Sequence, residues 1–380
     1  MSRITFIGDV MLGRMVGAKY AQQHYQIVSD ELKSTARDAD FVVANLESPV
    51  VKTAKTEGDH LQFAGNPDTL EDLKWIDAFS LSNNHINDCS ELGMEETINI
   101  LEDKGFKHNG LFKEQYEPLL LEKNSEKIAV VTVTDMMNIP FAEDNKWKTL
   151  RVGDPLVQEI IKEWHDKGWF VIVFAHIGIL FSRYPNPMTV DYLHTCVDAG
   201  AGTIVTAHSH CLGCKEEYKG VPIFHSLGDF VMDGNSWRRR RSGMLKLEIS
   251  GGQVKDWQII PAEINDEYET VEPDEKTRAK MLAEFNKVSK KLAKNIDAYT
   301  TFFKWQYKKE MVQHTISTLS YLTHTKGVGG MMKMVFKRFE EVGRMFTWMT
   351  KDRSHDQRDD DAIKADRKKF TQDELFSDKK

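Results

Sequence analysis

Short runs of apolar, β-prone residues alternate with amphipathic segments along the first half of the chain. The runs that predict buried strands are Arg3–Ile7, Phe41–Ala44, Phe79–Leu81, Phe170–Ala175 and Thr203–Ala207. Apolar residues have helical spacing in Ala18–Arg37, Leu92–Lys104, Leu156–Trp164 and Val190–Ala199. Because strands that alternate with helices form parallel sheets, this pattern predicts an α/β fold.

The region that follows is richer in strands than in helices. Leu119–Leu121 and Ile128–Val133 flank a short polar turn, which predicts a β-hairpin. Further β-type runs follow at Val221–His225, Met244–Ile249 and Val254–Ile260. Gly251-Gly252 marks a hairpin turn between the last two runs. Together these patterns predict two packed sheets flanked by helices.

The pattern changes near Pro261. From Pro273 to Met349, glycine and β-type runs are sparse, and apolar residues have helical spacing. Beyond Lys351 charged residues dominate without an apolar face, which is typical of a disordered segment. We therefore predict an α/β domain over residues 1–262, a helical extension over residues 263–350 and a charged, disordered tail over residues 351–380.

Composition narrows the class of protein. Hydrophobic residues make up 41% and charged residues 29% of the 380 residues, as in ordinary globular proteins. The formal net charge of −7 gives no reason to expect a nucleic-acid partner. No secretory signal precedes the first strand, the apolar run Trp169–Phe181 is too short to cross a bilayer, and four cysteines do not suggest a disulfide scaffold. We expect a cytoplasmic protein.

Polar residues that suit metal binding follow the predicted strands. They are Asp9, Asn45, Glu47, Asn84, His85, His176, His208 and His210. Because ligands bind at the carboxyl ends of strands in open α/β sheets, these side chains are expected to meet at one edge. Carboxylate, amide and imidazole groups are ligands for hard or borderline divalent cations. The set has enough oxygen and nitrogen ligands for two adjacent cations.

Each of these residues also has a simpler interpretation when it is considered alone. Asp9 can cap a turn, Glu47 can be a solvated loop acid, and His176 can be a hydrogen-bonded core histidine. The His208-x-His210 pair favours the metal site, because two imidazoles in one loop after a buried strand can reach the same ion. Only the joint occurrence of the set carries the prediction.

Five stretches carry a resemblance to a known family: Gly8–Arg14, Asn45–Pro49, Asn83–Asp88, His176–Gly178 and Ala199–Phe230. In these stretches, and in this order, the chain resembles the CapA family. That family is named for poly-γ-glutamate capsule synthesis proteins and lies within the calcineurin-like metallophosphoesterase superfamily. The resemblance covers about residues 3–262 and implies a four-layer α-β-β-α sandwich, here followed by the α-helical C-terminal extension.

The resemblance also implies roles for individual residues. Asp9 and His210 would bind one metal ion, Glu47 would bridge two ions, and the second ion would take Asn84, His176 and His208. His85 would be the general acid. The implied cofactors are two divalent metal ions, and Mn, Fe, Zn and Mg all remain open.

The chain departs from the family pattern at several positions. Met11 stands where the superfamily has a histidine ligand, so one of the two metal sites is expected to be weaker. Ile177 replaces a common tryptophan, Ser209 lies between the paired histidines, and Asp229 stands where an asparagine is common. These changes remove no predicted ligand, but they lie near the expected pocket and favour an altered substrate.

The leading hypothesis is a metal-dependent hydrolase, specifically a phosphoesterase, that acts in capsule or other surface-polymer metabolism. Arg14 and Asn45 are candidate substrate-binding residues for an anionic small molecule or polymer, although Arg14 equally fits a surface arginine. The alternatives are a non-catalytic assembly factor on the same fold and a hydrolase of amide or γ-glutamyl bonds. His85 favours catalysis, whereas Met11 favours the non-catalytic alternative.

Two further stretches have open interpretations. Arg238–Arg241 is expected to be a solvated loop, with contact to an anionic polymer as the alternative, and the Cys211/Cys214 pair is expected to be incidental. In the extension, Thr300–Leu319 and the stripe Val335, Phe339, Val342 and Phe346 are expected to pack on the domain. A homodimer contact, a synthase contact or a peripheral membrane contact are the alternatives, and Glu340 and Glu341 weaken the last.

Overall fold

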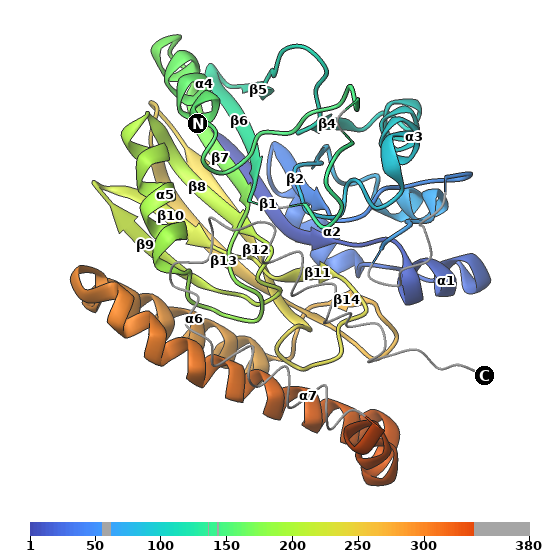
Figure 1. Cartoon of the computed structure of the whole chain (residues 1–380). Helices are drawn as coiled ribbons and strands as arrows, with labels where there is room; N and C mark the ends of the chain where they lie inside the picture. Colours follow the sequence, from blue (N-terminus) through green and yellow to red (C-terminus); the bar gives the residue numbers. More distant parts are fainter. Residues whose placement is uncertain (55–61, 136, 143, 338–380) are drawn as a thin grey trace.

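Two β-sheets lie face to face between two layers of helices in the computed structural model, which describes residues 1–54, 62–135, 137–142 and 144–337 (Figure 1). The first sheet has the order β14-β13-β12-β1-β2-β3-β4, with β11 paired to β1. Its strands are β1 (Ser2–Val10), β2 (Phe41–Leu46), β3 (Ala78–Ser80), β4 (Lys107–Asn109), β11 (Asp229–Val231), β12 (Arg241–Ile249), β13 (Val254–Ile264) and β14 (Thr270–Val271). Strands β1 to β4 are parallel, and β12 runs antiparallel to β1.

The second sheet has the order β5-β6-β7-β8-β10-β9. Its strands are β5 (Leu119–Lys123), β6 (Glu126–Thr134), β7 (Phe170–His176), β8 (Ala201–Ala207), β9 (Cys214–Tyr218) and β10 (Val221–His225). Strands β6, β7, β8 and β10 are parallel, whereas β5 and β9 pair antiparallel at the two edges. The predicted hairpin at β5 and β6 is therefore present.

Alternating side chains of the two sheets form the core between them. Phe6 of β1 and Phe174 of β7 meet there with their ring centroids 5.2 Å apart, and both are almost fully buried. Burial of one such large side chain stabilises the fold by about 1.5–3 kcal/mol. This apolar layer holds the two sheets in a fixed relation, so that residues at the ends of strands from both sheets can share one site.

Each sheet has its own helical layer on the outer face. The first sheet is covered by α1 (Arg14–Gln23), α2 (Asp30–Arg37), the 3-10 helix η1 (Pro67–Leu73) and α3 (Ser90–Asp103), whose apolar residues share one cluster with β1 and β2. The second sheet is covered by α4 (Pro155–Asp166) and α5 (Pro187–Asp198). These layers confirm the predicted α-β-β-α sandwich.

The segment 18–37, predicted as one amphipathic helix, forms parts of two helices. His24 adopts a left-handed conformation at the end of α1, with φ of 45°, and its N–H donates to the Tyr20 carbonyl oxygen. The Ser29 hydroxyl then caps α2. Ile27 and Val28, which lie between the two helices in the sequence, are fully buried. Their apolar side chains made the helical pattern look continuous, which is why the sequence predicted one helix.

Helices α6 (Glu275–Lys294) and α7 (Tyr299–Lys337), joined by the 3-10 helix η2 (Ile296–Ala298), run along one side of the sandwich (Figure 1). Met281 and Phe285 of α6 enter the core between the sheets, and Phe303, Tyr307 and Met311 of α7 pack with buried residues around Tyr184. The first part of the extension therefore packs against the domain, as expected. A break in the helical conformation occurs at Gly327.

Some predictions for the C-terminal third lie outside the described residues. They are the stripe Val335, Phe339, Val342 and Phe346, whose side chains are not described, and the tail over residues 351–380. The division at residue 262 stays a prediction, although β13 and β14 continue the first sheet to Val271. None of the described helices combines the length and apolarity that a bilayer crossing requires.

The run Arg238–Arg241 is not the expected solvated loop. Arg240 is fully buried and donates to the hydroxyl of Tyr321 and to main-chain carbonyls, including that of Ile264. Arg238 forms an ion pair with the buried Glu310 of α7. We name the segment Trp237–Arg240 the arginine turn. The guanidinium groups of Arg238 and Arg240 face the protein interior, where α7 supplies a partner to each.

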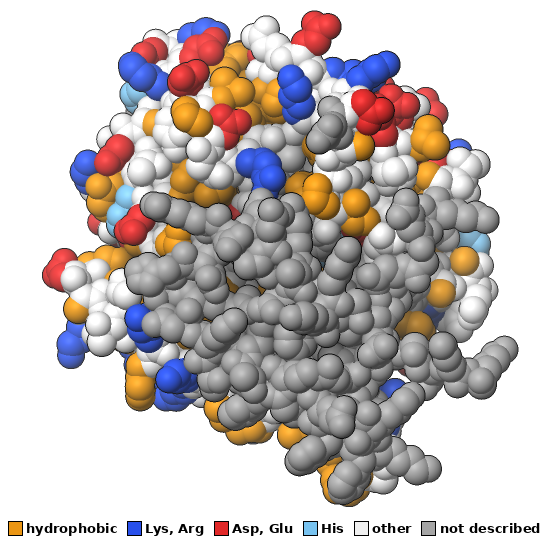
Figure 2. Space-filling model, viewed as in Figure 1, with side chains coloured by type: hydrophobic (Ala, Val, Ile, Leu, Met, Phe, Trp, Pro, Cys, Tyr) orange, Lys and Arg blue, Asp and Glu red, His pale blue; other side chains and the backbone are white. Residues whose placement is uncertain are grey.

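Basic and acidic side chains are interspersed with apolar ones on the face around α4 and β5 that Figure 2 shows.

The four cysteines are free, and all of them are buried. Cys211 and Cys214 therefore do not form a disulfide with each other, and their incidental role stays a prediction.

The buried ion pairs of Glu310 give a first prediction. Burial opposes the charge of Glu310, but the hydrogen bond from Arg183 and the charge of Arg238 outweigh burial and lower its pKa. Replacing Glu310 by Gln leaves Arg238 without its counter-charge and leaves Arg183 with only the half-exposed Glu284, so we expect the free energy of unfolding to fall by about 2–4 kcal/mol in urea denaturation.

Glu284 of α6 provides the matched control, since it bonds the same Arg183 from a half-exposed position. We expect Glu284→Gln to cost less than about 1 kcal/mol, because exposed pairs contribute little. Equal losses for the two variants would contradict the role assigned to Glu310.

Candidate metal centre

The polar residues predicted from the sequence converge at the carboxyl ends of strands from both sheets. Asp9 lies near the end of β1, and Glu47 follows β2 directly. His176 ends β7, and His208 follows β8. Because the sheets are stacked, the first supplies the carboxylates and the second supplies the imidazoles. All four of these side chains are nearly or fully buried.

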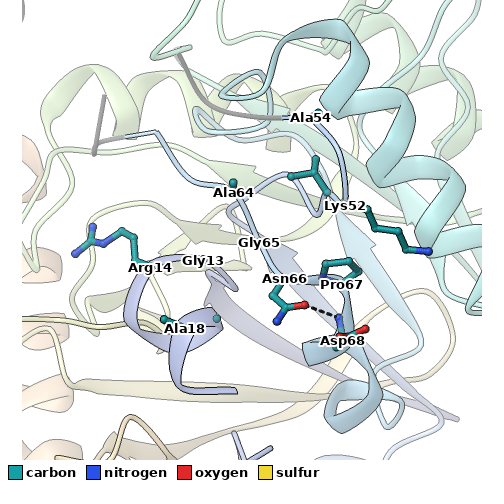
Figure 3. Close-up of a pocket in the computed structure, with 12 residues that line it drawn as sticks. Gly13, Arg14, Ala18, Lys52, Ala54, Ala64, Gly65, Asn66, Pro67 and Asp68 are labelled. Carbon is teal, nitrogen blue, oxygen red and sulfur yellow. Dashed lines mark hydrogen bonds between the residues drawn. The ribbon is translucent and has the colours of Figure 1, made fainter. Parts of the chain in front are cut away.

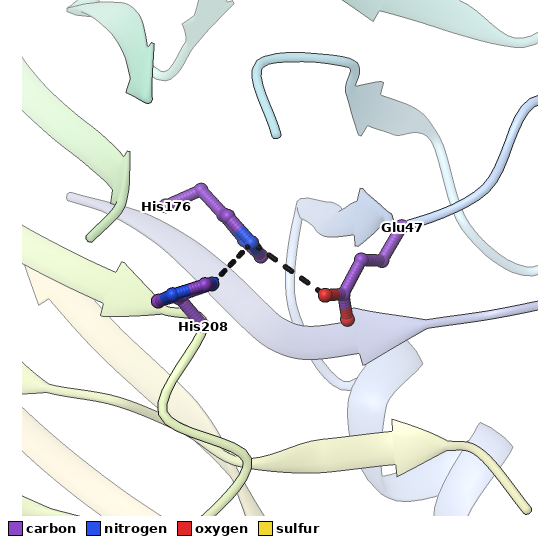
Figure 4. A group of neighbouring side chains, drawn as sticks. All are labelled: Glu47, His176 and His208. Carbon is purple, nitrogen blue, oxygen red and sulfur yellow. Dashed lines mark hydrogen bonds and ion pairs between the residues drawn. The ribbon is translucent and has the colours of Figure 1, made fainter. Parts of the chain in front are cut away.

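One group of donor atoms joins Glu47, His176 and His208 (Figure 4). His176 Nε2 lies 2.9 Å from His208 Nδ1 and 3.6 Å from Glu47 Oε1. The amide oxygen of Asn84 lies 2.7 Å from the same His176 nitrogen. The structure thus places the residues predicted for the second ion next to one another.

A second group joins Asp9, Glu47, His210 and Asp229. His210 Nδ1 lies 2.6 Å from Asp229 Oδ1 and 3.8 Å from Asp9 Oδ2. His210 Nε2 lies 4.0 Å from Glu47 Oε1. Glu47 belongs to both groups, which is the arrangement that a bridging ligand requires.

The surroundings of Glu47 test whether these residues fit a cation. Both carboxylate oxygens of Glu47 are buried and accept no hydrogen bond from the described residues. An uncompensated buried carboxylate is unfavourable, and its nearest positive candidates are imidazole nitrogens at 3.6–4.0 Å. These separations are too long for hydrogen bonds but suit ligands that share one ion. The donor set therefore fits divalent cations.

Burial shifts the pKa values of the cluster. Burial, together with the adjacent charge of Asp229, raises the pKa of Asp9 to about 8. Burial and the charge of Asp9 hold the pKa of Glu47 well above its usual range. Burial also lowers the pKa values of His176 and His210, so that both imidazoles favour the neutral, metal-binding form.

A close backbone approach and two unusual backbone conformations fix the geometry of the site. A Cβ on Gly8 would lie 2.1 Å from the carbonyl oxygen of Gly228, so only glycine allows β1 and β11 to approach. This approach sets Asp9 and Asp229 opposite each other in the strand register. His208 and His210 have positive φ angles of 102° and 58°, a strained conformation of the kind found at functional sites.

His85 lies beside the cluster rather than within either group. Its ring stacks on Phe63 with a centroid distance of 3.9 Å, and its Nδ1 lies 2.7 Å from Asp88 Oδ2. Its Nε2 lies 4.0 Å from Glu47 Oε1. The stack and the Asp88 contact orient the ring, which leaves Nε2 on the side of the carboxylate that both groups share.

Asn45, predicted to bind substrate, contacts the candidate ligands themselves. Its amide nitrogen donates to Asp9 Oδ1 at 2.8 Å and lies 3.1 Å from His176 Nδ1. Its oxygen accepts a hydrogen bond from the amide of Asn83. In the structure Asn45 links an acid of the first sheet to an imidazole of the second, and its contact with substrate stays a prediction.

Arg14 lines a groove of about 580 Å³ (Figure 3). Its guanidinium group pairs with Asp233 at 2.8 Å and lies over the ring of Phe63. Lys52 and Asp68 also line the groove, but none of the six predicted metal ligands does so in the described part of the chain. Binding of substrate by Arg14 stays a prediction.

Sequence reasoning did not assign Asp88 and Asp229. Asp229 was noted only as a departure from a common asparagine, yet its two oxygens contact His210 and Arg239. Asp88 follows His85 by three residues, a spacing that could have identified it as the partner of the imidazole. Met11, in contrast, packs with Phe63, Met232 and Ile264, and its sulfur accepts the N–H of Gly13.

Comparison with known proteins places these residues in a family context. Residues 3–234 match the family model described as bacterial capsule synthesis protein PGA_cap. The chain is 26% identical over 271 residues to the PGA biosynthesis protein CapA of Bacillus subtilis (strain 168), covering 69% of this chain and 71% of that protein. It is also 26% identical to the capsule biosynthesis protein CapA of Bacillus anthracis, with 69% and 67% covered.

Solved structures resemble the chain more distantly. A hypothetical protein from Thermus thermophilus is 15% identical with a TM-score of 0.44, covering 69% of this chain and 99% of that one. The 5′-nucleotidase from Candida albicans SC5314 is 9% identical with a TM-score of 0.40, covering 74% and 57%. The fold assignment rests on the layers described above.

The raised pKa values of the acids predict how the metal-free protein responds to pH. Above about pH 7 the imidazoles of His176 and His210 are mostly neutral in both states, whereas Asp9 keeps a proton that the unfolded chain releases. The folded state then binds more protons, so its stability falls as pH rises from about 7 to 8, by up to about 1.4 kcal/mol per pH unit and group.

Urea denaturation of the full chain in a chelator, at several pH values, measures this slope. We expect Mn²⁺ to remove the slope, because a bound cation replaces the protons. Asp9→Asn, which cannot hold the proton as a carboxyl group, should reduce the slope in chelator. A stability that is independent of pH in chelator would contradict the shared burial of these acids.

Proposed function

Because the chain belongs to the bacterial capsule synthesis protein PGA_cap family, we propose that it is a metal-dependent phosphoesterase acting in surface-polymer metabolism. The observation that carries the proposal is the position of Glu47. This buried carboxylate lies between two groups of donor atoms and faces the imidazole of His85. A buried carboxylate that is surrounded by imidazoles and accepts no hydrogen bond from the described residues would destabilise the fold by itself, whereas it fits a centre of two cations.

The chemistry follows from the residues around this carboxylate. Divalent cations bound there would polarise a phosphoryl oxygen and supply a nucleophile at neutral pH. Asn84, His176 and His208 would hold one ion, and Asp9, His210 and Asp229 the other, with Glu47 shared. Asp229 would provide the ligand that Met11 cannot, which offsets the weakening expected for that ion.

His85 is the proposed general acid. Asp88 and Phe63 fix its ring, so that Nε2 can donate a proton to the leaving oxygen of a substrate at the centre. Asn45 would keep Asp9 and His176 in place during the reaction. The proposed substrate is an anionic ester, since bound cations would attract it to this part of the molecule. The names of the CapA relatives support a role in polymer synthesis.

A non-catalytic assembly factor is the second candidate, and the environment of Met11 favours it. The thioether packs in an apolar cluster and bonds the Gly13 N–H, so the position of a common ligand holds no metal donor. An assembly factor would need neither the oriented His85 nor the His85–Asp88 contact. Turnover therefore separates the two candidates.

The test is the hydrolysis of p-nitrophenyl phosphate and of bis-p-nitrophenyl phosphate by the full chain with Mn²⁺. We expect metal-dependent turnover, and we expect His85→Asn to lower kcat by about 10²–10⁴-fold, the usual contribution of a general acid. The metal content of His85→Asn, measured by mass spectrometry, should equal that of the wild type, because His85 lies outside both donor groups.

His165→Asn provides the matched control, since His165 is an exposed residue at the end of α4 in the outer helical layer. Its kcat should equal the wild-type value. If a stably folded wild-type chain binds Mn²⁺ and hydrolyses neither ester, the enzyme proposal fails and the assembly factor stands.

A further inference from the structure

Arg239 is a charged residue of the metal centre that lies outside the family match of residues 3–234. It belongs to the arginine turn between β11 and β12, and its side chain is only 13% exposed. Its Nε donates to Asp229 Oδ2 at 3.1 Å, while the other oxygen of Asp229 contacts His210. A single carboxylate therefore connects the guanidinium group to the candidate ligands.

The terminal nitrogens of Arg239 have no hydrogen-bond acceptor among the described residues. The side chain donates one hydrogen bond to them, through Nε, although a guanidinium group carries five N–H donors. Within the described part of the chain, no residue accepts a hydrogen bond from the four N–H groups on Nη1 and Nη2. The charge of Arg239 also lowers the pKa values of Asp9, Glu47 and His210. For the two acids it opposes the larger effect of burial, which raises their pKa values, and for His210 it acts in the same direction as burial.

An aromatic ring restricts the guanidinium group on another side. Its Cζ lies 5.7 Å from the ring centroid of Phe181, a residue held at a positive φ of 64°. The Phe181 N–H donates to the carbonyl oxygen of Ser209, between the paired histidines. The Phe181 ring also stacks on His314 of α7, with a centroid distance of 4.1 Å. Phe181 therefore couples Arg239 and the histidine loop to α7.

Helix α7 fixes the backbone on both sides of Arg239. Arg238 bonds Glu310, and its N–H donates to the Ser317 hydroxyl at 3.1 Å. Arg240 bonds the Tyr321 hydroxyl. Because both neighbours of Arg239 are anchored to α7, the turn cannot shift freely, and the guanidinium group of Arg239 is held beside the acids of the metal centre.

We propose that Arg239 binds an oxyanion group of the substrate beside the metal centre, with α7 as the support that positions it. The proposal deepens the proposed function and rests on it for the identity of the substrate. A guanidinium group that is fixed at Nε and open at both terminal nitrogens suits two parallel hydrogen bonds to a phosphate or carboxylate group. A role as counter-charge to Asp229 alone would need neither the open fork nor the support.

The experiment measures the binding of inorganic phosphate to the full chain with Mn²⁺ by calorimetry. We expect Arg239→Gln to weaken binding at least tenfold, or about 1.4 kcal/mol. The phosphate affinity of Arg239→Lys should lie between those of the wild type and Arg239→Gln, since lysine keeps the charge but cannot form two parallel hydrogen bonds. A parallel titration with acetate distinguishes the two oxyanions: stronger binding of phosphate assigns a phosphate site, and stronger binding of acetate a carboxylate site.

Arg241→Gln provides the matched control, because Arg241 adjoins the arginine turn but pairs with Glu263. It should bind phosphate like the wild type. Equal affinities of wild type and Arg239→Gln would overturn the proposal, as would a wild type that binds neither anion. Loss of Mn²⁺ from Arg239→Gln in proportion to the loss of phosphate would assign Arg239 to the support of Asp229 and would also overturn it.

Kinetics separate this inference from the proposed function. With p-nitrophenyl phosphate, Arg239→Gln should raise KM at least tenfold and change kcat less. Phosphate binding that depends on Arg239 in a chain without turnover would leave the inference standing and end the phosphoesterase proposal. Turnover that is unchanged in Arg239→Gln would leave the enzyme standing and end the inference.

Discussion

A carboxylate without a hydrogen-bond donor is costly inside a protein, and the described residues supply none to Glu47 at the junction of the two sheets. Asp9 and Asp229 lie close by, so burial and like charge act on all three acids together. Protons can relieve this repulsion, but cations relieve it better, because imidazoles with lowered pKa values surround the acids. Bound cations would thus make this buried charge tolerable, and the donor set fits them.

The two-sheet architecture is what allows the acids and imidazoles to meet. Parallel strands β1 and β2 place carboxylates at one edge, and β7 and β8 place imidazoles at the matching edge of the stacked sheet. The apolar layer between the sheets keeps the edges in register. Two further contacts set the positions of the side chains. The absence of a side chain at Gly8 lets β11 approach β1, and the amide of Asn45 connects Asp9 of the first sheet to His176 of the second.

The C-terminal helices extend this arrangement beyond the residues that match the family. Glu310 of α7 compensates two arginines, one from the loop after β7 and one from the arginine turn. His314 supports Phe181, which lies over Arg239. Helix α7 thus supports residues beside the site, and the buried charge of Glu310 is explained by the arginines that it compensates.

The sequence by itself determined the strands that carry the site and the layered α/β class, and it singled out six candidate ligands, because hydrophobic periodicity and residue chemistry are local properties. It failed where distant partners decide the outcome. The helix predicted over residues 18–37 breaks because Ile27 and Val28 enter the core, and the arginine run is buried because α7 supplies Glu310 and Tyr321. Asp229 joins the cluster only because β11 pairs with β1. Tertiary structure alone decided these features, since burial and charge compensation depend on contacts between residues far apart in the chain.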